Sequence, residues 1–337
     1  MSFEVHNTNF TSLRDRFGRI HTSVRVSVTD RCNIRCFYCM PEKVQFMPRK
    51  EVLSYEEIVR VISILARLGI NQVRITGGEP LVRSNIWKLI QQIRSIGMIE
   101  DIGLTTNGLL LANQAHQLKQ AGLDRINVSL DSVDPKSFQE ITRRDGLEKV
   151  LRGIEMAKRV GFDRIRINAV SIKGRTESEI VPLAIFCRKH RLELRFIEFM
   201  PLDGDGNWLA DQVLSGKQVL DLISQEVAPL TRVYRHDPSQ PATDYEYPGG
   251  ERVGFINSVT EPFCESCNRL RMTAEGRLRN CLFANQEWDV RHLVRNGHDD
   301  AEIVDLIQAC VAAKKLGHGS NNGNFVRPER AMYQIGG

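Results

Sequence analysis

The chain has 337 residues, of which 42% are hydrophobic and 26% are charged, a composition typical of one large globular domain or of one domain with a smaller partner. A formal net charge of +5 is too small and too dispersed to indicate a nucleic-acid partner, although it suits an anionic small substrate. No apolar run approaches the roughly 18 residues that span a bilayer, and the first 17 residues lack the apolar core of a signal peptide. We therefore expect a cytoplasmic protein with no membrane partner.

Six apolar segments predict buried strands, and helical spacing of apolar residues separates them. The strands are expected at 23–29, 72–78, 101–108, 125–131, 164–172 and 193–200. Helices are expected after Ser54, at 86–93, at 147–154 and after Thr176. This alternation predicts βα units and a parallel sheet. Six units are too few for an eight-fold barrel, so the pattern leaves an open sheet or a partial barrel, with chemistry at the carboxyl ends of the strands.

The alternation ends near residue 205. Further on, the sequence predicts helices around 219–227 and near 299–313, and a hairpin at 274–277. We interpret residues 1–210 as the main domain and residues 211–337 as a smaller α+β region. The tail from His318 is rich in Gly and Asn, and its composition alone predicts disorder.

Three cysteines, Cys32, Cys36 and Cys39, follow the first predicted strand. Eight cysteines in a chain of this size argue against a disulfide framework and for free thiols that bind metal or react. Three thiolates suit a cubane iron-sulfur cluster with one iron left open. Zinc is the alternative, but it normally needs a fourth Cys or His nearby.

Another three cysteines, Cys264, Cys267 and Cys281, form a second set for which zinc is a stronger competitor, because pairs of cysteines two residues apart are common zinc ligands. The remaining two, Cys187 and Cys310, continue apolar helix faces and are expected in the core. Each triad is one ligand short of four, which suggests an exogenous ligand at each open iron.

Six arginines stand where a charge needs a partner. Arg25, Arg74, Arg166 and Arg195 lie inside strands that should be buried. Arg269 and Arg271 are two apart on a predicted strand and share one face. A triphosphate is an anion that such a cluster would neutralise, whereas structural ion pairs or a solvated face would explain any single one of them.

The first cysteine triad, with Gly77-Gly78-Glu79-Pro80 after the second strand, resembles the radical S-adenosylmethionine superfamily. With the second triad, the run from Asn268 to Arg271 and the final Gly-Gly, the chain from about residue 20 onward resembles the GTP 3′,8-cyclase family of molybdenum cofactor biosynthesis. The resemblance implies an incomplete six-unit (β/α) barrel closed by a C-terminal region that carries a second cluster. It also implies two [4Fe-4S] clusters, held by the two triads, and S-adenosylmethionine as cofactor.

The resemblance assigns roles to individual residues. It implies that S-adenosylmethionine contacts Tyr38, Gly78, Ser129 and Met200. It implies that GTP contacts Arg25, Arg74, Thr105, Arg166, Arg269 and Arg271. Arg166 stands where the family has lysine, which keeps the charge and changes the geometry. The resemblance also implies candidate catalytic residues. Gly336 and Gly337 are two of them, because the Gly-Gly end of this family is thought to enter the active site, and Arg195 is a third, as an arginine near the guanine ring.

The implied activity is radical cyclisation of GTP, by a homodimer that passes its product to cyclic pyranopterin monophosphate synthase. Two other functions remain open at this stage. A radical enzyme that modifies a peptide would keep the first triad and replace GTP by peptide, but the buried arginines favour the nucleotide. A zinc-stabilised nucleic-acid-binding module would suit the basic charge, but the βα units and the absence of a basic run oppose it.

Overall fold

The computed structural model describes residues 12–234, 237–319 and 325–337. Part of the tail predicted to be disordered, 320–324, and the segment considered as a signal peptide, up to residue 11, therefore lie outside the described residues. None of the helices in these three stretches is both long and apolar enough to cross a membrane.

All six predicted strands are present, and each pairs in parallel with the next along the chain. They are β1 (Ser23–Ser27), β2 (Gln72–Thr76), β3 (Asp101–Thr106), β4 (Arg125–Ser129), β5 (Ile165–Ser171) and β6 (Glu193–Glu198). Their aliphatic side chains are almost fully buried and form one continuous core with the surrounding helices. These aliphatic side chains alternate along the strands with less buried residues that line the cavity, such as Arg25 and Arg74.

The four predicted helices of this part are confirmed as α1 (Tyr55–Arg67), α2 (Ile86–Arg94), α5 (Leu147–Arg159) and α6 (Ile180–Lys189). Helix α1 begins with the capping box expected from its sequence, because Ser54 accepts from the backbone of Glu57 and the Glu57 carboxylate accepts from Ser54. Two helices were not predicted, α3 (Leu111–Gln120) and α4 (Pro135–Thr142). Cys187 and Cys310 are buried in the core, as predicted.

Residues 211–337 add strands to both edges of the same sheet. These strands are β7 (Thr231–Val233), β8 (Thr243–Glu246), β9 (Arg252–Ile256), β10 (Arg269–Met272), β11 (Arg277–Arg279) and β12 (Trp288–Asp289). The full order is β12-β11-β10-β1-β2-β3-β4-β5-β6-β9-β8-β7. Strands β10 and β9 join the parallel part beside β1 and β6, and β10 with β11 forms the predicted hairpin.

The helices of this region are α7 (Gly216–Glu226), α8 (Val290–Arg295), α9 (Asp300–Ala312) and α10 (Met332–Ile335). Short 3-10 helices occupy Arg49–Glu51, Pro80–Val82, Glu177–Glu179, Ala210–Gln212 and Cys264–Ser266. Helices α7 and α9 correspond to the two that the sequence predicts.

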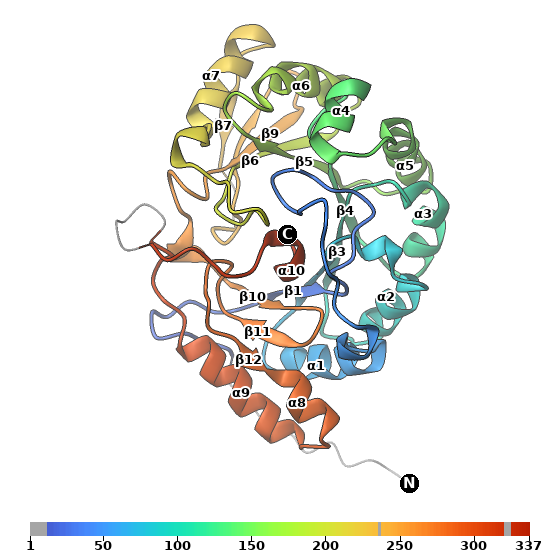
Figure 1. Ribbon diagram of the computed structural model, residues 1–337, viewed down its shortest axis with the longest axis vertical. Helices are drawn as coiled ribbons and strands as arrows, with labels where there is room; N and C mark the ends of the chain where they lie inside the picture. The colour runs from blue at the N-terminus through green and yellow to red at the C-terminus, as the bar shows by residue number, and fades with distance from the viewer. Residues whose placement is uncertain (1–11, 235–236, 320–324) are drawn as a thin grey trace.

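The sheet curves around a central space, with the long helices on its outside (Figure 1). Strands β12 and β7 stand at its two ends and do not pair with each other. The architecture is therefore an incomplete α/β barrel, which confirms the fold expected from the resemblance. Helix α10 and the C-terminus lie inside the curve (Figure 1), and Ile335 and Gly336 are buried. The expectation of disorder is therefore wrong for residues 332–337, because tertiary contacts order a segment whose composition lacks periodicity.

Candidate active site

A cavity of about 520 Å³ occupies the inside of the curved sheet. Both cysteine triads line it, and so do all the other predicted site residues except Gly336. These are Tyr38, Gly78, Ser129, Met200, Arg25, Arg74, Thr105, Arg166, Arg195, Arg269, Arg271 and Gly337. Residues from both ends of the chain thus meet in one space.

The first triad lies on the loop that follows β1. Its turn is held by the backbone N–H of Cys39, which donates to the carbonyl of Cys36 at 3.0 Å. Burial raises the pKa of Cys32 to about 11 and that of Cys39 to about 12. Each thiol also raises the pKa of its neighbours, since thiolates repel one another. These thiols keep their protons until a metal replaces them, so binding at this triad releases protons.

The Gly77-Gly78-Glu79 turn holds the cysteine loop against β2. The N–H of Gly78 donates to the Thr29 carbonyl at 2.7 Å, and the N–H of Glu79 donates to the Arg31 carbonyl at 2.8 Å. The buried carboxylate of Glu79 accepts from the Asn107 backbone at 2.6 Å. Burial raises the pKa of Glu79 to about 7. Asn107 therefore connects this turn to the first triad, because its side chain lies 3.8 Å from the Cys32 sulfur.

Gly78→Ala is expected to displace the cysteine loop. A Cβ at Gly78 would lie 2.4 Å from the Arg31 carbonyl oxygen, and no flexible side chain there can move away. Overpacking of this kind costs about 1–3 kcal/mol. We expect the variant to lose iron from the first triad and keep it at the second, measured by metal analysis after anaerobic purification. Gly97→Ala is the matched control, because a Cβ there has no neighbour within 4 Å; equal iron in both variants would contradict the argument.

The candidate S-adenosylmethionine residues lie near the first triad. Tyr38 is part of the cysteine loop and donates its hydroxyl to Asp131 at 2.6 Å. Burial raises the pKa of Asp131 to about 6. Ser129 ends β4 and Met200 follows β6, so both stand at the carboxyl edge of the sheet with the cysteine loop.

The second triad lies on the segment between β9 and β10 and on the loop after β11. Burial opposes ionisation of Cys267, but Arg269 and Lys314 outweigh it and lower the pKa of Cys267 to about 6. Burial raises the pKa of Cys264. The two triads therefore differ, because the cations Arg269 and Lys314 outweigh burial at Cys267, whereas burial dominates in the first triad and raises the pKa of each of its three thiols.

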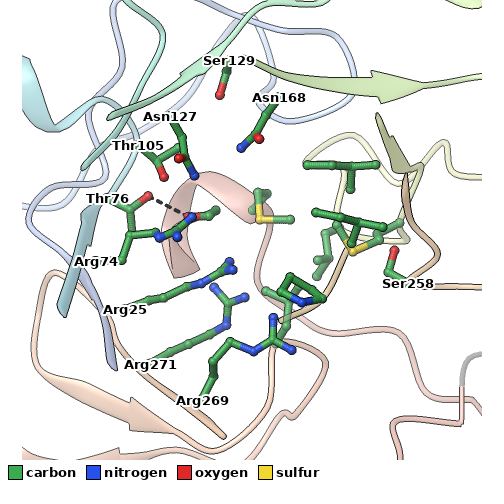
Figure 2. A pocket seen from close by; sticks show the side chains of 18 of the residues that line it. Arg25, Arg74, Thr76, Thr105, Asn127, Ser129, Asn168, Ser258, Arg269 and Arg271 are labelled. Carbon is green, nitrogen blue, oxygen red and sulfur yellow. Dashed lines mark hydrogen bonds between the residues drawn. The ribbon is translucent and has the colours of Figure 1, made fainter. Parts of the chain in front are cut away.

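Arginines form a row across three neighbouring strands. Arg271 of β10 is in register with Arg25 of β1, and Arg25 is in register with Arg74 of β2. Figure 2 shows these side chains, with Arg269, directed into the same space. Burial and the guanidinium of Arg269 lower the pKa of Arg271 to about 9. Burial, Arg271 and Arg74 lower the pKa of Arg25.

A row of buried like charges is costly without an anion. Among the residues that the structure describes, none of these four arginines makes an ion pair with a carboxylate. Arg269 stacks its guanidinium on the Phe263 ring at 4.7 Å, and Arg271 donates to the Gly336 carbonyl. The arrangement therefore suits a polyanionic ligand, whose oxygens match guanidinium forks.

Arg166 and Arg195 share a different partner. The Glu193 carboxylate accepts from Nε of Arg166 at 2.8 Å and from Nη2 of Arg195 at 2.8 Å. These two positions thus belong to a structural ion-pair network at the cavity wall, one of the alternatives that the sequence left open. Part of the hydrogen-bonding capacity of each guanidinium is already used.

Several polar residues of the cavity were missed from the sequence. The side chains of Asn127, Asn168 and Ser258 have buried polar atoms without a hydrogen-bond partner in the described structure. Thr105, which the resemblance had assigned to GTP, has a buried hydroxyl of the same kind. Figure 2 shows all four side chains facing the cavity. Buried polar atoms of this kind indicate a bound ligand or water. Asparagine is depleted in strands, so the two asparagines within buried β4 and β5 were the available clue.

The C-terminal tail reaches the arginine row. The carbonyl of Gly336 accepts from Arg271, and the carbonyl of Gly337 accepts from Thr76 Oγ1 at 3.0 Å. Two ion pairs anchor the tail further back, from Arg330 to Glu275 at 2.5 Å and to Glu287 at 2.6 Å. The tail thus ends inside the cavity.

The donor sets fit the implied clusters. Each triad presents three thiols to the cavity, and the thiols within a triad lie near enough to interact electrostatically. Among the described residues no three Cys, His, Asp or Glu side chains converge closely enough for one metal ion. Thiolates of a cubane cluster bind different irons and need not converge on one point. Cys32, Cys36 and Cys39 would hold one cluster, and Cys264, Cys267 and Cys281 the other.

Two family models match the chain, the radical SAM superfamily over residues 26–187 and Molybdenum Cofactor Synthesis C over residues 192–320. A GTP 3′,8-cyclase of Rhodopirellula baltica is 48% identical, over 99% of this chain and 95% of its own length. A GTP 3′,8-cyclase of Mycolicibacterium smegmatis is 45% identical, over 96% and 92%. Streptococcus suis SuiB bound to S-adenosylmethionine is 16% identical with a TM-score of 0.60, over 93% and 77%, a likeness of fold alone. By sequence identity over nearly its whole length, the chain belongs to the GTP 3′,8-cyclase family of radical SAM proteins.

Proposed function

We infer that this protein cyclises GTP to (8S)-3′,8-cyclo-7,8-dihydroguanosine 5′-triphosphate, the first step of molybdenum cofactor biosynthesis, with S-adenosylmethionine and two [4Fe-4S] clusters as cofactors. The observation that carries this function is the row of Arg25, Arg74 and Arg271, without carboxylate partners in the described structure, in a cavity lined by both cysteine triads. Curated relatives of the same length carry that activity in their names.

In the proposed reaction, the first cluster and S-adenosylmethionine supply, when bound, the carbon radical that removes hydrogen from C3′ of the ribose. The chain itself binds and orients the nucleotide. Arg25, Arg74 and Arg271 would hold phosphate oxygens, and Arg269 would place its guanidinium beside them. On the next three strands of the sheet, β3, β4 and β5, buried polar atoms of Thr105, Asn127 and Asn168 are suited to the ribose hydroxyls or the base edge. Fixing the ribose against the radical source is the main contribution of such a site.

The remaining arginines have different proposed roles. Arg166 would contact GTP with the nitrogens that Glu193 does not use, and Arg195 would deliver the proton that completes the product. Glu193 holds both guanidiniums in place. Cys264, Cys267 and Cys281 would hold the second cluster, which would supply an iron site for the guanine, and the Gly336-Gly337 end would border the reacting ribose.

Anaerobic incubation of the reconstituted protein with S-adenosylmethionine, a strong reductant and GTP deuterated at C3′ tests this function. The product is an isomer of GTP, so it must be separated by chromatography before mass analysis. We expect a new nucleotide with the mass expected after loss of the C3′ deuterium, and deuterium in the released 5′-deoxyadenosine. Unlabelled 5′-deoxyadenosine, or no new nucleotide, would overturn the proposal.

Replacing Arg269 and Arg271 together by alanine is expected to weaken GTP binding far more than S-adenosylmethionine binding. Each charge-assisted hydrogen bond that is lost costs about 1.5–3 kcal/mol, and both residues adjoin the second triad. Binding of each ligand is measured by calorimetry on the anaerobic protein. Arg277→Ala is the control, because Arg277 lies on the same hairpin but pairs with Asp289 at 2.7 Å. Equal loss of both ligands would instead indicate a folding defect.

We further propose that residues 1–210 act as the radical-generating part and residues 211–337 as the part that binds the second cluster and the substrate. We propose a cytoplasmic homodimer that delivers its product to cyclic pyranopterin monophosphate synthase, because a cyclised nucleotide triphosphate needs a second enzyme to build the pterin. Sedimentation of the anaerobic protein alone and with the synthase tests both associations.

A further inference from the structure

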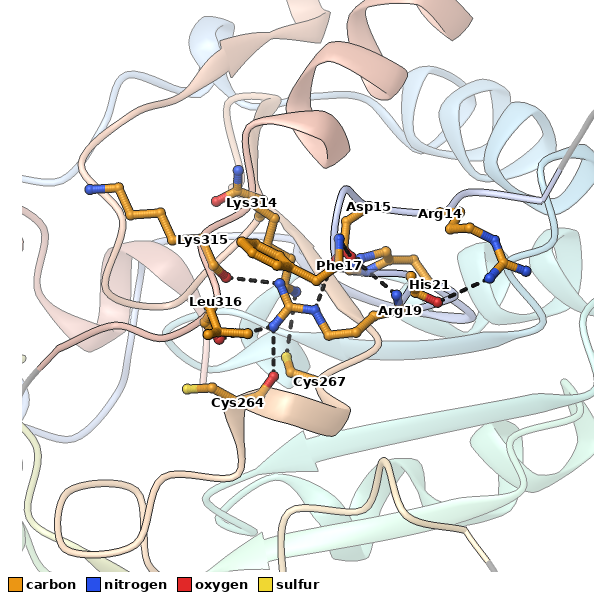
Figure 3. A network of polar contacts seen from close by, with 12 residues as sticks. Arg14, Asp15, Phe17, Arg19, His21, Cys264, Cys267, Lys314, Lys315 and Leu316 are labelled. Carbon is orange, nitrogen blue, oxygen red and sulfur yellow. Dashed lines mark hydrogen bonds and ion pairs between the residues drawn. The ribbon is translucent and has the colours of Figure 1, made fainter.

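A buried lysine stands behind the second cysteine triad. The Lys314 side chain follows α9, and the residue is 2% exposed. Its ammonium donates to the Cys267 sulfur at 3.4 Å and to the Arg269 carbonyl at 2.9 Å. Figure 3 shows Lys314 beside Cys267 and the N-terminal segment. A buried ammonium is costly unless an anion compensates it.

In the described structure, the group that compensates the Lys314 ammonium is not a carboxylate. Within residues 12–234, 237–319 and 325–337, Lys314 makes no ion pair with Asp or Glu. Burial lowers the pKa of Lys314, and the groups that oppose this and favour its charged form are the sulfur atoms of Cys267 and Cys281. A carboxylate does lie in the same network, at Asp15, but Arg19 binds it at 2.6 Å and His21 lies 3.2 Å from it.

The side chain of His21 interacts with both Lys314 and the Asp15 carboxylate. Burial, followed by the charge of Lys314, lowers the pKa of His21 to about 4, so the imidazole is neutral at physiological pH. It therefore adds no second positive charge beside Cys267. The charge balance of Lys314 depends on the thiolates of the second triad.

The geometry around Lys314 is fixed from the N-terminal side. Arg19 donates to the carbonyls of Cys264 at 2.7 Å, Lys315 at 2.8 Å and Leu316 at 3.1 Å (Figure 3). One guanidinium thus ties the turn that carries Cys264 and Cys267 to the segment that follows Lys314. Arg19 is itself held by Asp15 and is 9% exposed, so the contact between Lys314 and Cys267 is preorganised.

We propose that Lys314 is a positioning residue of the second cluster, whose buried ammonium compensates the Cys267 thiolate and raises the reduction potential of that cluster. A hydrogen-bond donor and a positive charge beside a cluster sulfur both favour the electron-rich reduced state. At the first triad the side-chain donors to sulfur are neutral, the amide of Asn107 at Cys32 and the hydroxyl of Tyr38 at Cys36, and Arg35 acts on Cys32 through its charge alone. The inference rests on the proposed function, which places a cluster at the second triad.

The test measures the midpoint potential of the second cluster alone. The parent is the full chain with Cys32, Cys36 and Cys39 replaced by alanine, reconstituted anaerobically and titrated by EPR. Lys314→Met removes the charge at similar volume, and Lys314→Arg keeps the charge. Lys315→Met is the matched control, because Lys315 is the next residue and is exposed.

We expect Lys314→Met to shift the potential to a more negative value at unchanged iron content. Lys314→Arg should return it toward the parent, and Lys315→Met should leave it unchanged. Loss of iron in Lys314→Met alone, in a protein with native circular dichroism, would also support charge compensation. If the methionine variant does not fold, the midpoint potential of Lys314→Gln, which also lacks the charge, tests the role of Lys314 instead.

Equal potentials in the parent and in the folded variant lacking the charge would overturn the role of Lys314 and leave the proposed function intact. A parent that retains no iron after reconstitution would instead show that the second triad holds no cluster. The proposed cofactor set and the role of Lys314 would then fail together. A purely structural lysine would lower the unfolding temperature without moving the potential.

Discussion

Replacing Cys32, Cys36 and Cys39 together by alanine is expected to abolish reductive cleavage of S-adenosylmethionine while the second triad keeps its iron. The two triads come from loops more than two hundred residues apart in the chain, and both line the cavity. Because we propose these thiols as all the protein ligands of the first cluster, their removal should leave no electron source beside the cofactor. The measurements are 5′-deoxyadenosine released under strong reductant and iron bound per chain.

Two controls make this result specific. Cys187→Ala removes a thiol that is 1% exposed in the core of α6, and it should leave 5′-deoxyadenosine formation unchanged. Replacing Cys264, Cys267 and Cys281 should give the converse phenotype, with cofactor cleavage retained and GTP binding lost. Undiminished 5′-deoxyadenosine formation in the first triple variant would refute the assignment of the first cluster.

Local patterns in the sequence predict most of the barrel because its elements are buried in simple ways. The six strands bury a face of aliphatic side chains in the core, and α1 has its capping box and a wide apolar face. Helix α3 was missed because it buries only Leu111, Ala115 and Leu118. Three residues in ten are a narrow stripe that polar neighbours obscure.

Pairing between distant segments is not encoded in local patterns. Strand β10 follows β1 by more than two hundred residues, yet Arg271 lies in register with Arg25. The arginine residues were recognisable because charges in apolar strands are unusual, but their alignment in one row required the tertiary structure. The contact of Lys314 with Cys267 could not be predicted for the same reason, since in the sequence Lys314 only follows an amphipathic helix and stands beside Lys315.

Buried polar atoms without a hydrogen-bond partner can likewise be recognised only in the folded structure. Nothing in the sequence distinguishes Ser258, whose buried hydroxyl has no partner in the described structure, from any other serine in a loop. The Glu193 carboxylate shows the opposite case. It binds Arg166, one of the five arginines predicted to contact GTP, and Arg195, a predicted catalytic residue.

Removal of Gly336 and Gly337 is expected to suppress GTP cyclisation while sparing both clusters and S-adenosylmethionine cleavage. The two carbonyls accept from Arg271 and Thr76, so the last two residues contact residues proposed to hold GTP, whereas the packing of the tail against Cys32 and Cys39 comes from Ala331 and Tyr333, which this truncation keeps. Without it, Arg271 loses a partner and the cavity opens toward solvent. The measurements are the rate of cyclised nucleotide formation and, separately, the rate of 5′-deoxyadenosine release.

An alanine is expected to cause more strain at Gly336 than at Gly337. Gly336 has φ of 87°, and a Cβ there would lie 2.6 Å from Thr76 Cγ2, so Gly336→Ala is strained in both backbone and packing. A Cβ at Gly337 would meet Met332 at 3.7 Å, an ordinary contact. We therefore expect Gly336→Ala to reproduce the truncation, whereas Gly337→Ala should leave the tail in place and impair cyclisation only through contact with bound substrate.

Rescue by a peptide separates a lost tail from a damaged fold. Arg330 anchors the tail through Glu275 and Glu287, so a synthetic peptide covering residues 325–337 contains both the anchor and the Gly-Gly end. Added to an enzyme truncated before residue 325, it should restore part of the cyclisation rate, at concentrations set by the effective concentration lost with the covalent link. A peptide with Arg330→Ala should restore less, because it lacks the ion pairs that hold it. Normal cyclisation by the truncated enzyme without peptide would show that the tail has no part in the reaction.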